Sequence, residues 1–213
     1  MPLVETTFCA TGAAFAELAA VARARGLDDA GWSLLVGSLP EKVRAPLQGS
    51  DPKEAFDEQL YAQALHALDG KLGDDGTFAR AVGRARGDAV LATERATFDG
   101  DPLRFLKLGA GEFYRERLNY GASALELTPK KAILRFIFSP HLTLKIGEAN
   151  NKGPLVVLGY LEHTVSELAG DPQSARYTGN AKRADTRFGQ TVYNQHFEFD
   201  LDETPPPSRS YGS

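Results

Sequence analysis

The chain has 213 residues, of which 42% are hydrophobic and 24% are charged, so it can bury a sizeable core. Its formal net charge of −4 excludes a strong general attraction for nucleic acid. No run of about 18 apolar residues predicts a membrane span, and the first residues lack the pattern of a secretory signal. A single cysteine, Cys9, cannot form an internal disulfide, which fits a reducing compartment. These features predict a cytoplasmic globular protein.

Helical patterns fill the first part of the chain, to about residue 119. Asp51 and Asp101 each precede a proline, and this pair of residues is typical of a helix N-terminus. Apolar residues at spacings of three and four follow both signals. They predict helices over about 51–70 and 101–119.

Beyond about residue 121 the apolar residues alternate as they do in strands. Residues 121–139 and 173–199 are each expected to form a β-hairpin, with a helix over 154–169 between them. The predicted fold class is therefore α+β: an amino-terminal helical layer packed on a small antiparallel sheet made of two hairpins separated by a helix.

The expected domain organisation is simple. We predict one α+β domain over residues 1–203, with a helical part over about 3–119 and a sheet part over about 120–203. Residues 204–213 are polar and follow a run of prolines, so they are expected to form a disordered tail.

Several site chemistries are excluded by spacing. The four histidines and Cys9 are scattered, and no pair has the C-x-x-C or H-x-x-x-H spacing of a metal site. Gly109 and Gly111 open like a dinucleotide-binding loop, but Tyr114 stands where the third glycine belongs. P-loop and nucleophile-elbow motifs are absent. We therefore predict no metal, no cofactor and no catalytic residues, and a binding protein rather than an enzyme.

Aromatic residues are dense between residues 105 and 138. Phe113 lies on a buried helical stripe, while Phe136 and Phe138 lie on one face of a predicted strand. Helix and sheet must pack together, so these rings are expected to converge near the centre of the domain. The result is either a pocket or a plain aromatic core.

The predicted helix 154–169 brings polar groups to the same region. Tyr160 and His163 share one face, and Glu167 follows His163 one turn later, where a carboxylate would orient the imidazole. A solvated helix face is the alternative. The candidate ligand-binding residues are Phe113, Tyr114, Phe136, Phe138, Tyr160 and His163.

The last hairpin contains a basic loop with a single acid. A cluster of this kind can hold an anion or an acidic partner, although loops between strands are often merely polar. The candidate anion-binding or partner-binding residues are Arg176, Lys182, Arg183 and Arg187.

One pattern resembles a known family. A glycine-led helix over Gly159-Tyr160-Leu161-Glu162 ends at Gly170, and Arg187-Phe188-Gly189 leads to a last strand ending in Phe197-Glu198-Phe199. This resembles the carboxy-terminal half of the 4-vinyl reductase domain, a fold related to heme–nitric-oxide-binding domains and to vesicle-tethering subunits. A wider pattern over residues 3–202 resembles an uncharacterised myxobacterial family. It comprises Gly31-Trp32, Leu39-Pro40, Arg44, Gly100-Asp101-Pro102 and Phe113-Tyr114.

The resemblance implies a binding or sensing domain, because related domains bury small aromatic or lipid-like ligands. Two departures bear on cofactors. Residues 176–199 contain none of the cysteines of the 4-vinyl reductase pattern, and the chain has no Tyr-x-Ser-x-Arg signature of heme–nitric-oxide-binding domains. Heme is therefore not expected.

We predict a non-enzymatic cytoplasmic ligand-binding or sensory domain for a small, largely apolar ligand. The alternative is an adaptor that binds another protein and no small-molecule ligand. One version of this alternative is a homodimer. A reductase-like activity, implied by the resemblance, is a third alternative. The expected partners are a small apolar ligand or a protein, with no nucleic acid and no membrane span.

Overall fold

A computed structural model describes residues 9–114, 117, 122–128, 130–138, 147, 150–172, 174–185 and 190–200. The fold is α+β, as predicted. The helical part contains β1 (Cys9–Thr11), α1 (Gly12–Ala24), α2 (Asp29–Gly37), α3 (Glu41–Gln48), β2 (Ala55–Asp57), α4 (Glu58–Leu72), α5 (Thr77–Phe98) and α6 (Pro102–Leu108), with short 3₁₀ helices η1 (Asp74–Gly76) and η2 (Ala110–Tyr114). The sheet part contains β3 (Ala122–Leu127), β4 (Lys131–Phe138), α8 (Gly153–Ala169), β5 (Ala175–Asp185) and β6 (Gln190–Asp200).

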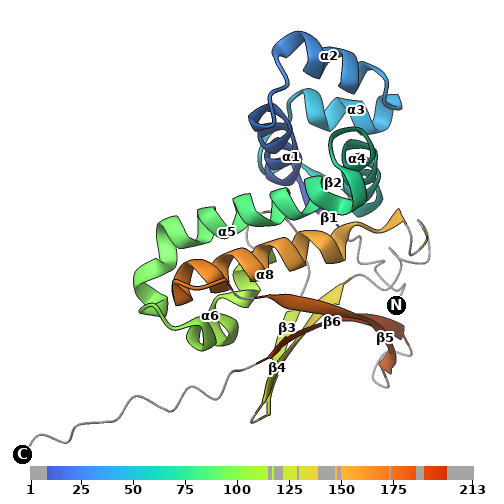
Figure 1. Cartoon of the computed structure of the whole chain (residues 1–213). Helices are drawn as coiled ribbons and strands as arrows, with labels where there is room; N and C mark the ends of the chain where they lie inside the picture. Colours follow the sequence, from blue (N-terminus) through green and yellow to red (C-terminus); the bar gives the residue numbers. More distant parts are fainter. Residues whose placement is uncertain are drawn as a thin grey trace, which may run out of the picture.

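The elements form layers (Figure 1). Helices α1–α4 pack at one end, and α5 and α8 lie side by side across the middle. The sheet covers the other side of α8. Because α8 lies between α5 and the sheet, it is buried on most of its circumference, from Val156 to Leu168. A helix that is apolar nearly all round is the expected solution for that position.

The sheet has the strand order β3-β4-β6-β5, and all neighbours are antiparallel. This confirms the two predicted hairpins, which meet through the β4–β6 pair. Leu134 and Phe197 are paired in register and buried on the inner face. Strand alternation therefore places Arg135 and His196, the next pair along, on the outer face.

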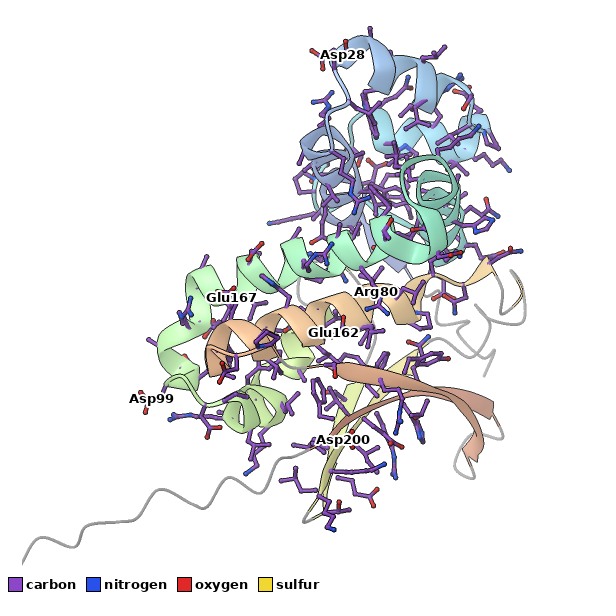
Figure 2. All side chains as sticks on the ribbon, in the orientation of Figure 1. Asp28, Arg80, Asp99, Glu162, Glu167 and Asp200 are labelled. Atoms are coloured by element: carbon purple, nitrogen blue, oxygen red, sulfur yellow. The ribbon has the colours of Figure 1, made fainter. Side chains whose placement is uncertain are left out.

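Helices α5 and α8 approach each other closely because glycines stand at their contact. A Cβ atom on Gly83 would lie 2.0 Å from the Val156 carbonyl oxygen, and one on Gly159 would lie 2.2 Å from the Arg80 carbonyl oxygen. Backbone therefore packs against backbone along the middle layer. At its edge, Arg80 Nη1 donates to Glu162 Oε2 over 2.7 Å (Figure 2).

The predicted helix start at Asp51 is wrong. The Asp51 carboxylate does cap a backbone N–H, that of Lys53 at 2.8 Å, but in a turn. Phe56 follows in strand β2, paired with Ala10 of β1. Helix α4 begins only at Glu58, where Asp57 is the capping residue. The Asp51 side chain therefore caps a backbone N–H as the sequence indicates, but it stabilises a turn and not a helix.

The helix predicted over 101–119 also ends early. The Asp101 cap is confirmed, but α6 stops at Leu108 and a 3₁₀ helix follows Gly109. A Cβ on Gly109 would lie 2.5 Å from Cζ of Phe98, so the chain bends where this glycine meets a buried ring. The predicted tail over 204–213 lies outside the described residues. Within the described part, no helix is long and apolar enough to cross a membrane.

Candidate functional site

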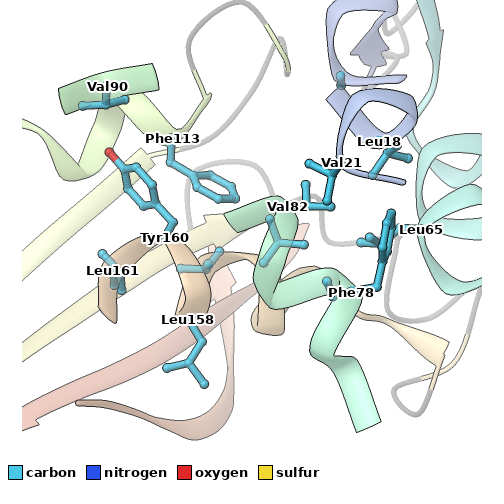
Figure 3. Packing of buried hydrophobic residues seen from close by; sticks show 14 of the residues in the cluster. Leu18, Val21, Leu65, Phe78, Val82, Val90, Phe113, Leu158, Tyr160 and Leu161 are labelled. Carbon is cyan, nitrogen blue, oxygen red and sulfur yellow. The ribbon is translucent and has the colours of Figure 1, made fainter. Parts of the chain in front are cut away.

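Aromatic residues of α6, η2, α8 and the sheet converge, as predicted. Phe113 of η2 lies with its ring centroid 5.6 Å from Phe136 of β4 and 5.4 Å from Tyr160 of α8. Figure 3 shows Phe113 and Tyr160 lying against each other. Phe105 of α6 and Phe197 of β6 extend these contacts at 5.6 Å and 5.7 Å. We call these five rings the aromatic cluster; all are buried.

The Tyr160 hydroxyl is fixed inside this cluster. It donates a hydrogen bond to the Gly109 carbonyl oxygen over 2.8 Å. Burial, with a smaller contribution from the nearby Glu112 carboxylate, raises the pKa of the Tyr160 phenol above its usual value. Tyr160 is therefore a neutral side chain whose single donor is already engaged.

A buried ion pair adjoins the aromatic cluster. The Arg86 guanidinium of α5 lies 4.4 Å from the Phe113 ring centroid, and Nη1 donates to the Phe113 carbonyl oxygen over 3.4 Å. Its Nε donates to Glu17 Oε2 of α1 over 3.0 Å, and Nη2 contacts the same oxygen. Nη2 also donates to the Tyr61 hydroxyl over 3.2 Å, and Arg117 Nε reaches Glu17 Oε1 over 2.7 Å.

We call Glu17, Arg86, Arg117 and Tyr61 the Arg86 junction. Burial is the largest single effect and opposes the charged form of Arg86, but the Glu17 carboxylate and the Tyr61 side chain together outweigh it, so the pKa of the guanidinium rises above its usual value. Because the Arg86 junction contacts α1, α4, α5 and η2, it connects the aromatic cluster to the amino-terminal helices.

His163 does not have the partner expected from the sequence. Its Nε2 lies 2.6 Å from Asp88 Oδ1 of α5, whereas Glu167 contributes its backbone oxygen to Arg95. The reason is the packing of α8 against α5, which brings a carboxylate from the neighbouring helix closer than the one a turn away. His163 therefore belongs to the α5–α8 contact rather than to the five rings.

The structure thus unites three of the predicted ligand-binding residues: Phe113, Phe136 and Tyr160. The side chains of Tyr114 and Phe138 lie outside the described residues. Of the predicted anion-binding residues, Arg176 donates to Glu198 over 3.0 Å, so a carboxylate of its own sheet already accepts from it. The side chains of Lys182 and Arg183, and the whole of Arg187, lie outside the described part of the chain.

Sequence reasoning missed Gln195 of β6. This side chain is 2% exposed, and its Oε1 is buried without a hydrogen-bond partner. It stands directly opposite Phe136 in the β4–β6 pair and on the same face as Phe197. The signal was available, because alternation from Phe197 and Phe199 places residue 195 on the inner face.

Comparisons with known proteins place the fold. No protein-family model and no curated protein matches the sequence. Solved structures of H-NOX domains do match. An unliganded Fe(II) H-NOX mutant from K. algicida gives a TM-score of 0.58 at 11% identity, covering 91% of this chain and 98% of that one. An oxygen-binding H-NOX domain related to soluble guanylate cyclases, in its oxygen complex, gives 0.56 at 13%, covering 95% and 99%.

A third match, from work on heme redox potential and porphyrin distortion, has a TM-score of 0.56 at 12% identity and covers 90% of this chain and 99% of that one. The chain therefore has an H-NOX-like fold over most of its length. This confirms, at the level of fold, the resemblance to heme–nitric-oxide-binding domains.

The described residues do not fit a heme at the aromatic cluster. A heme iron needs an axial ligand such as histidine, cysteinate or tyrosinate. Tyr160 is a neutral donor to Gly109, His163 is paired with Asp88, and His196 lies on the outer face of the sheet. His66 is exposed on α4. No group of three or more His, Cys, Asp or Glu in the described ranges is placed to hold a metal ion.

Proposed function

We propose that the chain is a non-enzymatic sensory domain that binds a small, largely apolar ligand other than heme at the aromatic cluster. The observation that carries the proposal is the contact between this cluster and the Arg86 junction: Phe113 contacts both Tyr160 and Arg86. Supporting it, one protein of similar fold is described as an oxygen-binding H-NOX domain.

The geometry offers a path from ligand to shape change. A ligand that enters beside Phe113 would displace the Phe113 ring. Because the Arg86 guanidinium lies over that ring, Arg86 would have to move as well. Arg86 also donates a hydrogen bond to Glu17 of α1, so a shift of Phe113 would change the position of α1. Ligand binding would then favour one arrangement of the amino-terminal helices over another.

The test compares two buried phenylalanines. Phe113→Leu alters the aromatic cluster, whereas Phe15→Leu alters a ring that packs on Phe56 and Tyr61 in the amino-terminal layer. We expect p-xylene to bind the wild-type protein and the Phe15→Leu variant equally, and the Phe113→Leu variant about tenfold more weakly or more tightly. Equal affinities in all three proteins would identify a plain aromatic core. Native mass spectrometry of protein from its own host would report a co-purified ligand.

A second candidate is the interaction adaptor, in homodimeric form. The observation in its favour is that β3 is an outer strand of the sheet and leaves Leu127 44% exposed. Outer strands with exposed apolar residues can pair with another chain. Light scattering on the wild-type protein and on Leu127→Lys tests this: a dimer that the substitution dissociates supports it, and a wild-type monomer refutes it.

Other features remain predictions from the sequence. They are the relation to the 4-vinyl reductase domain and to a myxobacterial family, a cytoplasmic location, a single domain over residues 1–203, and anion binding by the basic loop of the last hairpin. None of them enters the argument for the sensory function.

A further inference from the structure

We propose that Gln195 is the group that orients the ligand, and that this ligand carries one hydrogen-bond donor on a flat, mostly apolar body. The inference rests on the proposed function of the aromatic cluster and names the chemistry of its ligand. Phenols and indoles are the class described: a ring that packs on other rings, with a single O–H or N–H.

The first step is the position of Gln195. It faces Phe136 directly across the β4–β6 pair, where opposite Cβ atoms lie about 5 Å apart. Phe197, two residues later, lies on the same face and contacts Phe136. The amide is therefore attached to the sheet at the edge of the aromatic cluster. On its other side it stands opposite Asn180 of β5, whose side chain lies outside the described residues.

The second step is the missing partner. Oε1 of Gln195 is buried and accepts no hydrogen bond from the residues that the structure describes. A buried acceptor left in this state costs about 1–3 kcal/mol, and apolar residues would serve this position at no such cost. Two other buried polar side chains have partners: Thr164 Oγ1 donates to the Tyr160 carbonyl oxygen over 2.7 Å, and Asp69 accepts from the Ala79 N–H over 3.0 Å. Ser50 Oγ and His196 Nε2, like Gln195 Oε1, have no partner among the described residues.

The third step is what can supply the partner. An amide oxygen accepts from O–H or N–H groups, so the partner must be a donor. The Tyr160 hydroxyl is already committed to Gly109. A donor on a molecule that enters the aromatic cluster would satisfy Oε1 and fix the orientation of that molecule, while its apolar part contacts the rings.

The experiment uses two probes of nearly equal shape, p-cresol and p-xylene, of which only p-cresol has a donor. Binding to the full chain is followed by calorimetry or by NMR. We expect p-cresol to bind the wild-type protein at least tenfold more tightly than p-xylene. Gln195→Leu should abolish this preference by weakening p-cresol alone. Gln63→Leu, on the exposed face of α4, is the control and should leave both affinities unchanged.

The outcomes separate the two proposals. Equal affinities of the wild-type protein for both probes, unchanged in Gln195→Leu, would overturn the role of Gln195 and leave the apolar site standing. Failure of both probes to bind would count against the site itself. A Gln195→Leu variant that unfolds at a clearly lower temperature and shows no change in preference would mean that the amide serves the fold, for example through a buried water. Gln195→Met provides a second apolar variant if leucine disrupts folding.

Discussion

Arg86 and Gln195 are both buried polar side chains, but the fold treats them differently. Arg86, 1% exposed, donates from all three guanidinium nitrogens, to Glu17, Tyr61 and the Phe113 carbonyl. Gln195, 2% exposed, leaves its Oε1 without a partner. Burying a charge without partners costs far more free energy than burying an amide oxygen without a partner, so only the second occurs in a stable fold.

The difference separates two roles of buried polar groups in one molecule. The Arg86 junction is complete within the chain, so its role is to hold α1, α4 and α5 together. Gln195 is incomplete, and it lies beside the rings that the sequence and the structure both bring together. Four substitutions or conditions test this contrast, from the largest expected effect to the smallest.

Removing the carboxylate from the Arg86 junction should have the largest effect. Glu17→Leu leaves Arg86 buried without its anion, which should lower the free energy of unfolding by about 3–5 kcal/mol, measured by urea denaturation. The double variant Glu17→Leu, Arg86→Met should recover much of this loss, because it also removes the stranded charge; Arg117 is partly exposed and can reach solvent. A cost below about 1 kcal/mol for the single variant would show that the ion pair does not hold the junction.

Adding a charge at the unsatisfied position should have the next largest effect. Gln195→Glu keeps the shape of the side chain but places an ionisable carboxyl in a buried site, where burial raises its pKa. We expect the free energy of unfolding to fall by roughly 2–3 kcal/mol at pH 8, which corresponds to a rise of about two units in the pKa of the new carboxyl. At pH 5 the carboxyl is protonated in the folded protein, so the loss should be much smaller. Equal stability at the two pH values would mean that water reaches residue 195.

The sequence predicted the parts of this contrast that depend on local pattern. Alternation gave the two hairpins, and the glycine and proline after α8 gave its end, since these signals act within a few residues. The sequence-based prediction of a helix was wrong at residues 51–57. There an Asp-Pro cap stabilises a turn, and Phe56 falls at helical spacing from Leu60 although it lies in a strand. The sequence could not predict the Arg86 junction, because Glu17 and Arg86 are 69 residues apart and no local pattern links them. For Gln195, alternation predicts the buried face but not the absence of a partner.

Removing the Tyr160 hydroxyl should have a modest effect. The Gly109 carbonyl that accepts from it also accepts from the Glu112 N–H over 2.9 Å, so the carbonyl is not left unsatisfied. Tyr160→Phe should therefore lower the free energy of unfolding by only about 1 kcal/mol, the net value of one hydrogen bond. A loss above about 3 kcal/mol in urea denaturation would mean that the hydroxyl also organises the aromatic cluster, and would weaken the distinction drawn for Gln195.

The smallest expected effect is a pH dependence on the outer face of the sheet, where His196 Nε2 is also buried without a partner. Burial, and then the adjacent Arg135 guanidinium, lower the pKa of His196, while Glu198 and Glu126 oppose the shift. The unfolded chain therefore binds a proton near pH 6.5 that the folded chain does not yet bind, so stability falls as the pH drops below about 6.5 towards the folded pKa. Hydrogen bonds from Lys131 and Arg176 lower the pKa of Glu198, so its stabilising contribution is lost only in a separate, more acidic range. Melting temperatures measured between pH 7.5 and pH 5 should decline more steeply for the wild-type protein than for His196→Gln. Parallel curves would show that this buried nitrogen, unlike the oxygen of Gln195, is open to water.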